Sequence, residues 1–219
     1  MMVYDSHEQP SYSTDRIQGS KQSEQQNSRV SCTSHSHWCC LDWRSSFEEG
    51  KHGGTITDIG IHAIDALPWI TGLEWAKINA ARCWNAFAPE YPHFADAGQM
   101  MLEMENGCGV LGDVSYFAPD RAGYHMPYYW RTTFWGRDGV IETATTAKEI
   151  HLLGKDDDEV QILPLAPAQK GGHLRAFLAD IAGETPHNGL DTAAVLRSAR
   201  QVIRIQQAAD GGEREVACQ

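Results

Sequence analysis

Residues 50–72 of this 219-residue chain read GKHGGTITDIGIHAIDALPWITG. Two adjacent glycines, Gly53 and Gly54, open the stretch, and Gly72 closes it. Glycine on both sides of a mostly apolar run is typical of a helix that is bounded by turns. The stretch therefore predicts a flexible turn and then a helix from Thr55 to Thr71.

The predicted helix sorts into two faces at about 100° per residue. An apolar stripe holds Ile59, Ala63, Ala66, Leu67 and Ile70. A narrow polar stripe holds Asp58, His62 and Asp65, each one turn from the next. A carboxylate one turn from an imidazole can orient the ring and raise its pKa, which suits a histidine that transfers protons near neutral pH. Asp58 and His62 are therefore candidate catalytic residues.

Two structural interpretations compete with a catalytic role. Thr55 and Asp58 fit a pattern similar to a capping box, in which Asp58 would only start the helix. Asp58 and His62 also fit an ordinary solvated pair, because polar pairs at this spacing are common on helices. Spacing alone favours these structural interpretations.

The rest of the folded segment, residues 41–212, alternates short β-forming runs and ends in helices. Strands are expected near residues 77–87, 99–105, 110–117, 128–135, 140–143, 149–153 and 160–163, and helices near 174–182 and 192–209. The turn Asn106-Gly107 between two such runs is a strong hairpin signal. This order predicts an α+β domain with a predominantly antiparallel open sheet and helices packed on one face. The other face needs a partner, either a domain or a subunit.

Composition separates the two ends from this segment. Residues 1–40 are rich in Ser, Gln and His and hold few aliphatic side chains, so they cannot bury enough apolar surface to offset their chain entropy. We expect a disordered or misassigned tail at 1–40 and a second tail at 213–219. Cys32, His35, His37, Cys39 and Cys40 lie close together but lack the spacing of a zinc site, so no metal site is expected.

The formal net charge is -11, which disfavours nucleic acid and anionic membrane surfaces as partners. No apolar run approaches the ~18–20 residues of a membrane span, and the first residues lack the layout of a secretory signal. We therefore expect a cytoplasmic protein whose six cysteines are reduced.

The stretch 50–72 resembles the start of the C-terminal domain of the Gfo/Idh/MocA oxidoreductases, which include glucose–fructose oxidoreductase and inositol dehydrogenase. The family pattern there is a Gly-Gly turn followed by Asp-x-x-x-His-x-x-Asp on a helix. Three later segments agree in order: QMMLEMENGCGVLGDVSYF, FWGRDGVIET and SARQVIRIQQAADGG. The resemblance extends from about Trp43 to Gly212.

This resemblance implies an oxidoreductase acting on a sugar or polyol, in which a substrate hydroxyl loses its proton while the carbon gives a hydride to NAD or NADP. His62 is similar to the catalytic acid/base of the family, and Asp58 is similar to the carboxylate that accompanies it. Asp65 matches the family's second aspartate, for which a structural role is expected. The resemblance also implies a homo-oligomer that forms through the open sheet face.

The sequence shows none of the motifs of the cofactor-binding half of such an enzyme. The family begins with a Rossmann domain, whose Gly-rich turn and helix N-terminus hold the pyrophosphate, and which usually ends in a Glu-Lys-Pro motif. This chain has no Lys-Pro pair, and residues 1–40 are too short and too polar for that fold. Residues 107–112 spell G-x-G-x-x-G, but they fall inside the predicted hairpin. We expect no Rossmann domain and no cofactor-binding residue.

The aromatic stretch YHMPYYW, residues 124–130, holds candidate substrate contacts. Aromatic faces stack on sugar rings, and His125 or Tyr128 can bond to hydroxyls. A packed sheet face or an oligomer contact explains the same composition. His173, which opens the penultimate helix, is a third and looser candidate. The sequence predicts the substrate-binding part of an NAD(P)-dependent oxidoreductase, incomplete as it stands. The alternative is a non-catalytic binding or oligomerisation module.

Overall fold

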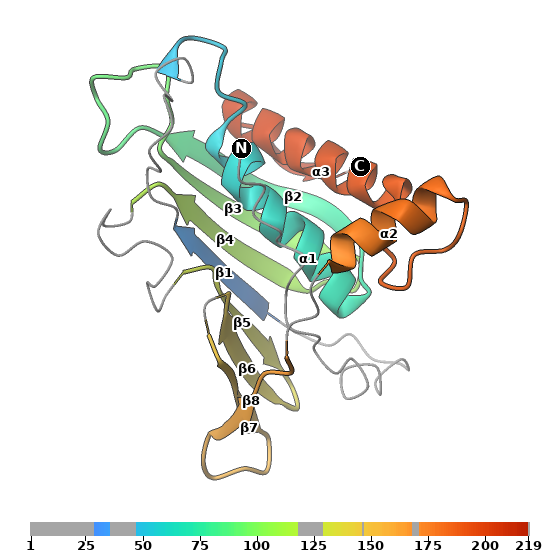
Figure 1. The fold of residues 1–219 in the computed structure, drawn as a ribbon. Coiled ribbons are helices and arrows are strands. Elements are labelled where there is room, and N and C mark those ends of the chain that lie inside the picture. The colour runs from blue at the N-terminus through green and yellow to red at the C-terminus, as the bar shows by residue number, and fades with distance from the viewer. Residues whose placement is uncertain (1–28, 36–46, 118–128, 146, 168–170, 219) are drawn as a thin grey trace.

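The computed structural model describes residues 29–35, 47–117, 129–145, 147–167 and 171–218 (Figure 1). These residues form one sheet in the order β8-β7-β6-β5-β1-β4-β3-β2-β9. The strands are β1 (Arg29–His35), β2 (Trp75–Trp84), β3 (Ala97–Met104), β4 (Gly109–Ser115), β5 (Arg131–Gly136), β6 (Gly139–Ala144), β7 (Glu149–Gly154), β8 (Gln161–Pro164) and β9 (Arg214–Ala217). Within these ranges only β1 and β4 run parallel, so the prediction of a predominantly antiparallel sheet is confirmed.

Helices cover one face of this sheet, as predicted. They are the π-helical turn η4 (Ile56–Gly60), α1 (Ile61–Thr71), α2 (Gly172–Ile181) and α3 (Thr192–Gly211). Figure 1 shows α1 and α3 lying across β2, β3 and β4. The core between these layers includes Ile56, Ile64, Leu67, Trp75, Ile78, Leu102, Val110, Val202 and Ile205. None of the helices described is long and apolar enough to cross a membrane.

The first helix differs from the prediction in its phase. Its buried residues are Ile56, Ile59, Ile64 and Leu67, so the expected apolar stripe shares only Ile59 and Leu67 with the real one. The cause is the π-helical start, because i→i+5 hydrogen bonds widen the turn and rotate the side chains that follow.

The hairpin predicted at Asn106-Gly107 is present. It joins β3 to β4, with Leu102 opposite Val110. Gly107 has φ +80°, and a Cβ added there would have no atom within 4 Å. Gly112 lies within β4, where a Cβ would come 2.8 Å from Cε of Met100, so this glycine makes room for a core side chain.

The expectation for the N-terminal tail is wrong for seven residues. β1, Arg29–His35, pairs in parallel with β4 and antiparallel with β5. The composition argument considered only apolar side chains, whereas a strand with neighbours on both sides is held largely by backbone hydrogen bonds. The remainder of 1–40 lies outside the described residues.

The expectation of a tail at 213–219 is also wrong. β9 pairs with β2, and Cys218 directly after it is fully buried. Lys77 of β2 forms an ion pair with Glu215 of β9. The polar composition misled the prediction because edge strands tolerate charged side chains.

Candidate functional site

The start of the first helix is fixed by a side chain from α3. Oε1 of Gln206 accepts hydrogen bonds from the backbone N–H groups of Ile56 at 3.0 Å and Thr57 at 3.4 Å, and its Nε2 donates to Asp210 at 2.8 Å. Gly54 has φ +102°, and a Cβ there would lie 2.1 Å from Cδ of Gln206. Glycine at this position therefore allows Gln206 to cap the helix.

The capping-box interpretation of Thr55 and Asp58 is wrong. The Thr55 hydroxyl donates to the carbonyl oxygen of Ala95 and makes no bond to the helix start. The Asp58 carboxylate instead accepts a hydrogen bond from the hydroxyl of Tyr116. Both side chains point to segments distant in sequence, so they link the helix start to the loops around β3 and β4.

Asp58 belongs to a cluster that sequence reasoning missed. Nε2 of His52 lies 3.0 Å from the Tyr116 hydroxyl oxygen, and Nδ1 of His52 accepts from the Gly54 N–H at 3.2 Å. Burial lowers the pKa of His52, an effect that the nearby Asp58 partly opposes. Burial first, and then the Asp58 charge, raises the pKa of Tyr116. Both groups are therefore neutral near pH 7.

His62 lies against an aromatic ring. Its imidazole centroid is 3.9 Å from that of Trp130, with the planes inclined by 48°. Trp130 has φ +51°, which is rare for a residue other than glycine and recurs at functional sites. Its indole Nε1 is buried and, among the described residues, has no hydrogen-bond partner. This donor is therefore a buried polar atom that the described part of the chain leaves unsatisfied beside a candidate catalytic histidine.

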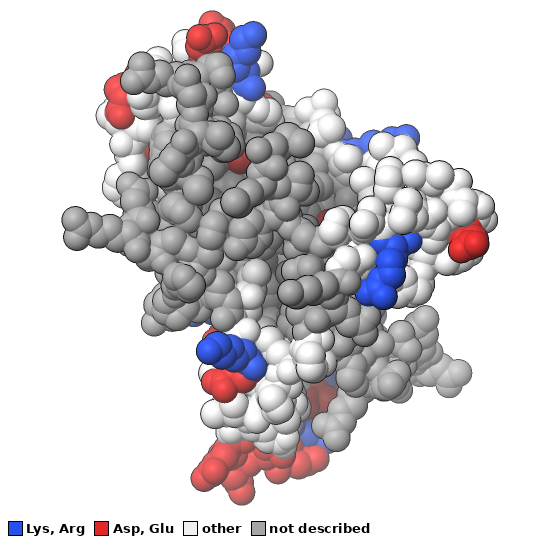
Figure 2. All heavy atoms as spheres, viewed as in Figure 1, with Lys and Arg blue, Asp and Glu red and all other residues white. Residues whose placement is uncertain are grey.

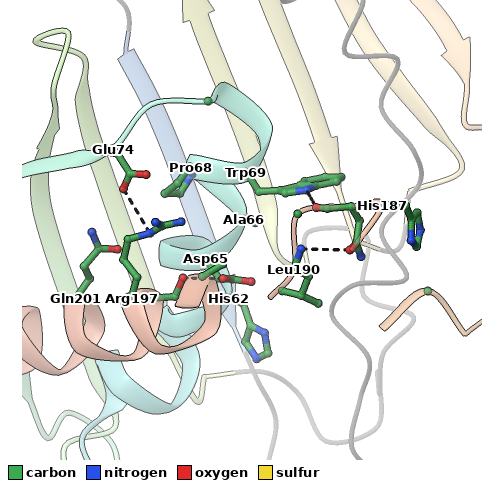
Figure 3. Close-up of a pocket in the computed structure, with 16 residues that line it drawn as sticks. His62, Asp65, Ala66, Pro68, Trp69, Glu74, His187, Leu190, Arg197 and Gln201 are labelled. Atoms are coloured by element: carbon green, nitrogen blue, oxygen red, sulfur yellow. Dashed lines mark hydrogen bonds and ion pairs between the residues drawn. The ribbon is translucent and has the colours of Figure 1, made fainter. Parts of the chain in front are cut away.

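A pocket of about 420 Å³ opens between α1, α3 and the loop before α3 (Figure 3). Its polar lining includes His62, Asp65, Glu74, His187, Arg197 and Gln201. Trp69 adds an aromatic wall, and its indole N–H donates to the carbonyl oxygen of Asn188 at 2.8 Å. His62 and Asp65 lie one turn apart on α1 and both line the pocket, with Asp65 pointing toward α3. The pocket thus brings together two of the three residues of the predicted polar stripe.

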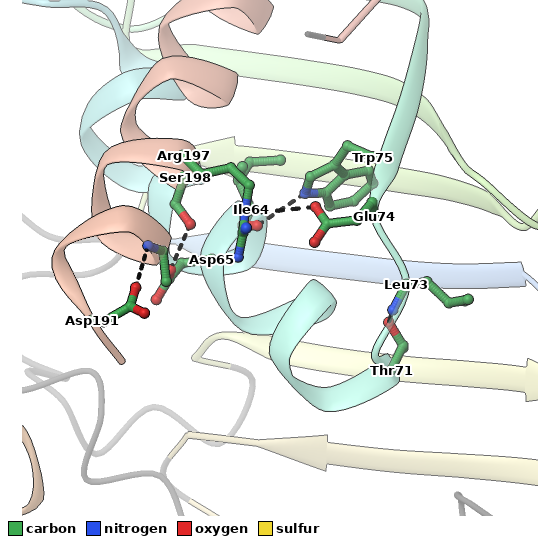
Figure 4. A network of polar contacts seen from close by, with 10 residues as sticks. Ile64, Asp65, Thr71, Leu73, Glu74, Trp75, Asp191, Arg197 and Ser198 are labelled. Atoms are coloured by element: carbon green, nitrogen blue, oxygen red, sulfur yellow. Dashed lines mark hydrogen bonds and ion pairs between the residues drawn. The ribbon is translucent and has the colours of Figure 1, made fainter. Parts of the chain in front are cut away.

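The pocket wall is tied together by polar contacts (Figure 4). The Ser198 hydroxyl donates to Asp65 at 2.7 Å, which joins α3 to α1. Arg197 forms an ion pair with Glu74, with Nε and Oε2 3.7 Å apart. The contact to Ser198 agrees with the expected structural role of Asp65, which stays a prediction.

The other predicted site residues are distributed differently. Asp58 is exposed and, within the described structure, is not a lining residue of the pocket. His173 is exposed on α2, whereas its neighbour Gly172 lines the pocket. His125 and Tyr128 lie outside the described residues. No signal in the sequence singled out Trp130, although it stands in the aromatic stretch.

The described residues do not fit a dinucleotide. Such a cofactor needs a Gly-rich turn at a free helix N-terminus. Gly109 and Gly112 belong to strand β4, and the helix start after Gly54 is already capped by Gln206. Across these same ranges, no three His, Cys, Asp or Glu side chains are placed to hold a metal ion. The pocket places imidazole and carboxylate side chains together, groups that can exchange protons.

Solved structures share this fold. A Thermotoga maritima protein whose structure is described as that of an oxidoreductase aligns with a TM-score of 0.70 and 18% sequence identity. The alignment covers 86% of this chain and 54% of the Thermotoga maritima chain. The aldose-aldose oxidoreductase from Caulobacter crescentus, complexed with glycerol, aligns with a TM-score of 0.65 and 19% sequence identity. The alignment covers 88% of this chain and 55% of that enzyme. An oxidoreductase from Agrobacterium radiobacter in complex with NAD+, L-tartaric acid and magnesium aligns with a TM-score of 0.63 and 19% sequence identity. The alignment covers 88% of this chain and 57% of that protein. The chain therefore spans about half the length of these proteins.

Sequence comparison gives the family. A search of the curated proteins found no match. Residues 28–142 match the family described as GFO/IDH/MocA C-terminal domain. The match begins one residue before β1, which agrees with the place of that strand in the sheet. Because it covers more than half of the sequence, the chain belongs to the GFO/IDH/MocA family.

Proposed function

We propose that this chain forms the substrate-side half of an NAD(P)-dependent oxidoreductase acting on a CH–OH group of a sugar or polyol. His62 would be the acid/base, and Asp58 the carboxylate that accompanies it. The observation that carries the proposal is the position of His62, which lines the pocket and lies against Trp130. Family membership supports the same reading.

The chemistry of the pocket suits a polyhydroxylated molecule. A volume of about 420 Å³ lies within the roughly 300–1,000 Å³ of small-molecule sites. Trp69 lines the pocket, and aromatic faces pack on the C–H face of a sugar ring. The imidazole of His62 can accept the proton of a substrate hydroxyl. His125, Tyr128 and His173 remain proposed substrate contacts.

Ligands of the similar structures support this substrate class. Glycerol in the Caulobacter crescentus enzyme is a polyol, and L-tartaric acid in the Agrobacterium radiobacter protein carries two hydroxyls. NAD or NADP would have to be held by a domain other than the described residues. Within the proposal the protein works in the cytoplasm, where Cys83, Cys108 and Cys218 would stay free thiols, as they are here.

A polyol titration tests the proposal. The full chain, labelled with ¹³C in its histidines, is titrated with glycerol, myo-inositol and glucose while the His62 resonance is followed by NMR. At least one polyol should shift that resonance. In His62→Asn the resonance of His187, which also lines the pocket, is followed instead, and binding should be about tenfold weaker, the loss of one well-placed hydrogen bond. His151→Asn on exposed β7 is the control and should bind normally. Absence of binding by all three polyols, or equal binding by His62→Asn, would contradict the proposal.

A second candidate function is a non-catalytic binding or oligomerisation module. Side chains alternate between sheet faces, so Met101, Leu111 and Trp135 lie opposite their core-facing neighbours on the face without helices. They are 47%, 39% and 50% exposed, and Met101 pairs with Leu111 across β3 and β4. Such a patch suits a second copy of this chain. A strictly monomeric protein in size-exclusion chromatography with light scattering would count against this module.

A further inference from the structure

Three polar side chains from separate segments meet at the start of the first helix. His52 belongs to the turn before Gly54, Asp58 to η4, and Tyr116 follows the end of β4. The Tyr116 hydroxyl contacts both of the others. The proposed function gives a role to Asp58 alone and leaves the His52–Tyr116 pair unexplained.

The direction of each hydrogen bond in this cluster follows from one backbone donor. The N–H of Gly54 donates to Nδ1 of His52, so Nδ1 carries no proton and the neutral ring is protonated at Nε2. Nε2–H then donates to the Tyr116 oxygen, and the Tyr116 hydroxyl donates to Oδ2 of Asp58. The chain of donors therefore ends on the carboxylate.

The surroundings keep this direction fixed. The His52 ring meets Phe94 edge-on at 4.8 Å, and Phe94 lies 5.2 Å from Tyr116 between centroids. Burial lowers the pKa of His52, and a proton on Nδ1 would face the Gly54 N–H donor. The cluster thus orients groups and does not store a proton.

We infer that Tyr116, oriented by His52, is a positioning residue that holds the Asp58 carboxylate in one orientation, one turn before His62. One oxygen of Asp58 is occupied by Tyr116, and the exposed side chain leaves the other oxygen available. The inference rests on the proposed function, in which Asp58 accompanies His62.

Histidine NMR on the full chain tests the inference without any substrate. In the protein labelled with ¹³C and ¹⁵N in its histidines, the His52 resonance is assigned by its loss in His52→Gln, and its ¹⁵N shifts report which nitrogen holds the proton. We expect the Nε2–H form. Asp58→Asn should lower the pKa of His52, because it removes the charge that raises it. Asp158→Asn, an exposed carboxylate on the β7–β8 turn, is the charge-matched control and should leave it unchanged.

The coupling through Tyr116 is then measured by a double-mutant cycle. The charge of Asp58 acts on His52 through space, so part of its effect should remain in the Tyr116→Phe background. The effect of Asp58→Asn on His52 should nevertheless become smaller there, because the hydroxyl that contacts both groups is gone. The Nδ1–H form, or a coupling that Tyr116→Phe leaves intact, would overturn the inference. Thermal melting verifies that each variant folds.

Polyol affinity connects the cluster to the site. Tyr116→Phe should weaken polyol binding by less than His62→Asn does, because Tyr116 acts through Asp58 and not on the ligand, and it should add no loss in the Asp58→Asn background. Full affinity in Tyr116→Phe would contradict a positioning role. If the wild-type chain binds no polyol, the proposed function fails, while the His52 measurements still decide the inference.

Discussion

The two ends of the sheet are stabilised in different ways. β2, β3, β4 and β9 lie under η4, α1 and α3 and form the helix-covered half, which contains the buried core. β5, β6, β7 and β8 form what we call the arm, from which, among the described residues, only Phe134 packs against that core. Arm side chains such as Trp135 and Ile162 are exposed. Figure 2 shows acidic side chains gathered at the lower end of the arm, where Asp156, Asp158 and Glu159 lie.

This difference shows where a precise site can be built. Asp58, His62 and Asp65 all stand on the first helix, which packs on the core and is tied to α3 by Gln206 and Ser198. Trp130 lies directly before β5, and its ring brings the start of the arm into contact with His62. The helix-covered half therefore holds the candidate acid/base His62 in place, and the start of the arm contacts its ring.

The largest effect is expected on the free energy of unfolding when one tryptophan from each region is replaced by alanine. Trp75 is 1% exposed, and its indole N–H donates to the Ile64 carbonyl oxygen at 2.9 Å, so Trp75→Ala should lower the free energy of unfolding by about 3–5 kcal/mol. Trp135→Ala on the arm should cost less than about 1 kcal/mol. Urea denaturation measures both. Similar losses for the two variants would mean that the arm is packed as firmly as the core.

A middle-sized effect concerns the joint between η4 and α3. Gly54→Ala forces a side chain onto a left-handed backbone and displaces the Gln206 cap, so it should cost about 2–3 kcal/mol. Gly107→Ala is the matched control, because its φ is also positive but nothing lies near its Cβ position; it should cost about 1 kcal/mol. Equal costs in chemical denaturation would show that Gln206 does not hold the helix start.

The smallest effect is a dependence of stability on pH that comes from the helix-covered half. The pKa of His52 is below its ordinary value of 6.5 in the folded protein, so below 6.5 the unfolded chain binds more protons than the folded one. Stability should therefore be complete above 6.5 and fall as the pH drops through 6.5 toward the folded pKa. Melting temperatures between pH 7.5 and 5 should show this fall, and His52→Gln should reduce it. An equal fall in His52→Gln and in the wild-type protein would assign the pH dependence to other groups.

Local signals in the sequence predicted most of the fold. Asn106-Gly107 placed the β3–β4 hairpin, and α3 begins where expected because the Asp191 side chain caps it by accepting from the Ala194 N–H at 2.7 Å. The phase of the first helix was not predictable, because it begins with a π-helical turn whose first N–H groups bond to Gln206, 150 residues from Ile56 in the chain. Apolar periodicity carries no trace of such a contact.

For the candidate site, the sequence predicted a location and not the contacts. The helical spacing of His62 and Asp65 placed them on one face, and both line the pocket, while their roles stay predictions. The partners of Asp58 could not be predicted, since Tyr116 is 58 residues away and His52 lies in a turn. The left-handed backbone of Trp130 is likewise set by the entry into β5 and leaves no pattern in the neighbouring residues.

The place of β1 has a consequence for how the sheet holds together. It is the strand that joins β4 of the helix-covered half to β5 of the arm, with backbone bonds on both sides. Its withdrawal would split one continuous sheet into two and leave the adjoining sides of β4 and β5 with unpaired N–H and C=O groups, which readily recruit strands from other molecules. The seven residues of β1 therefore act as a seam between the two halves of the sheet, and their pairing covers two strand sides that would otherwise be open to other molecules.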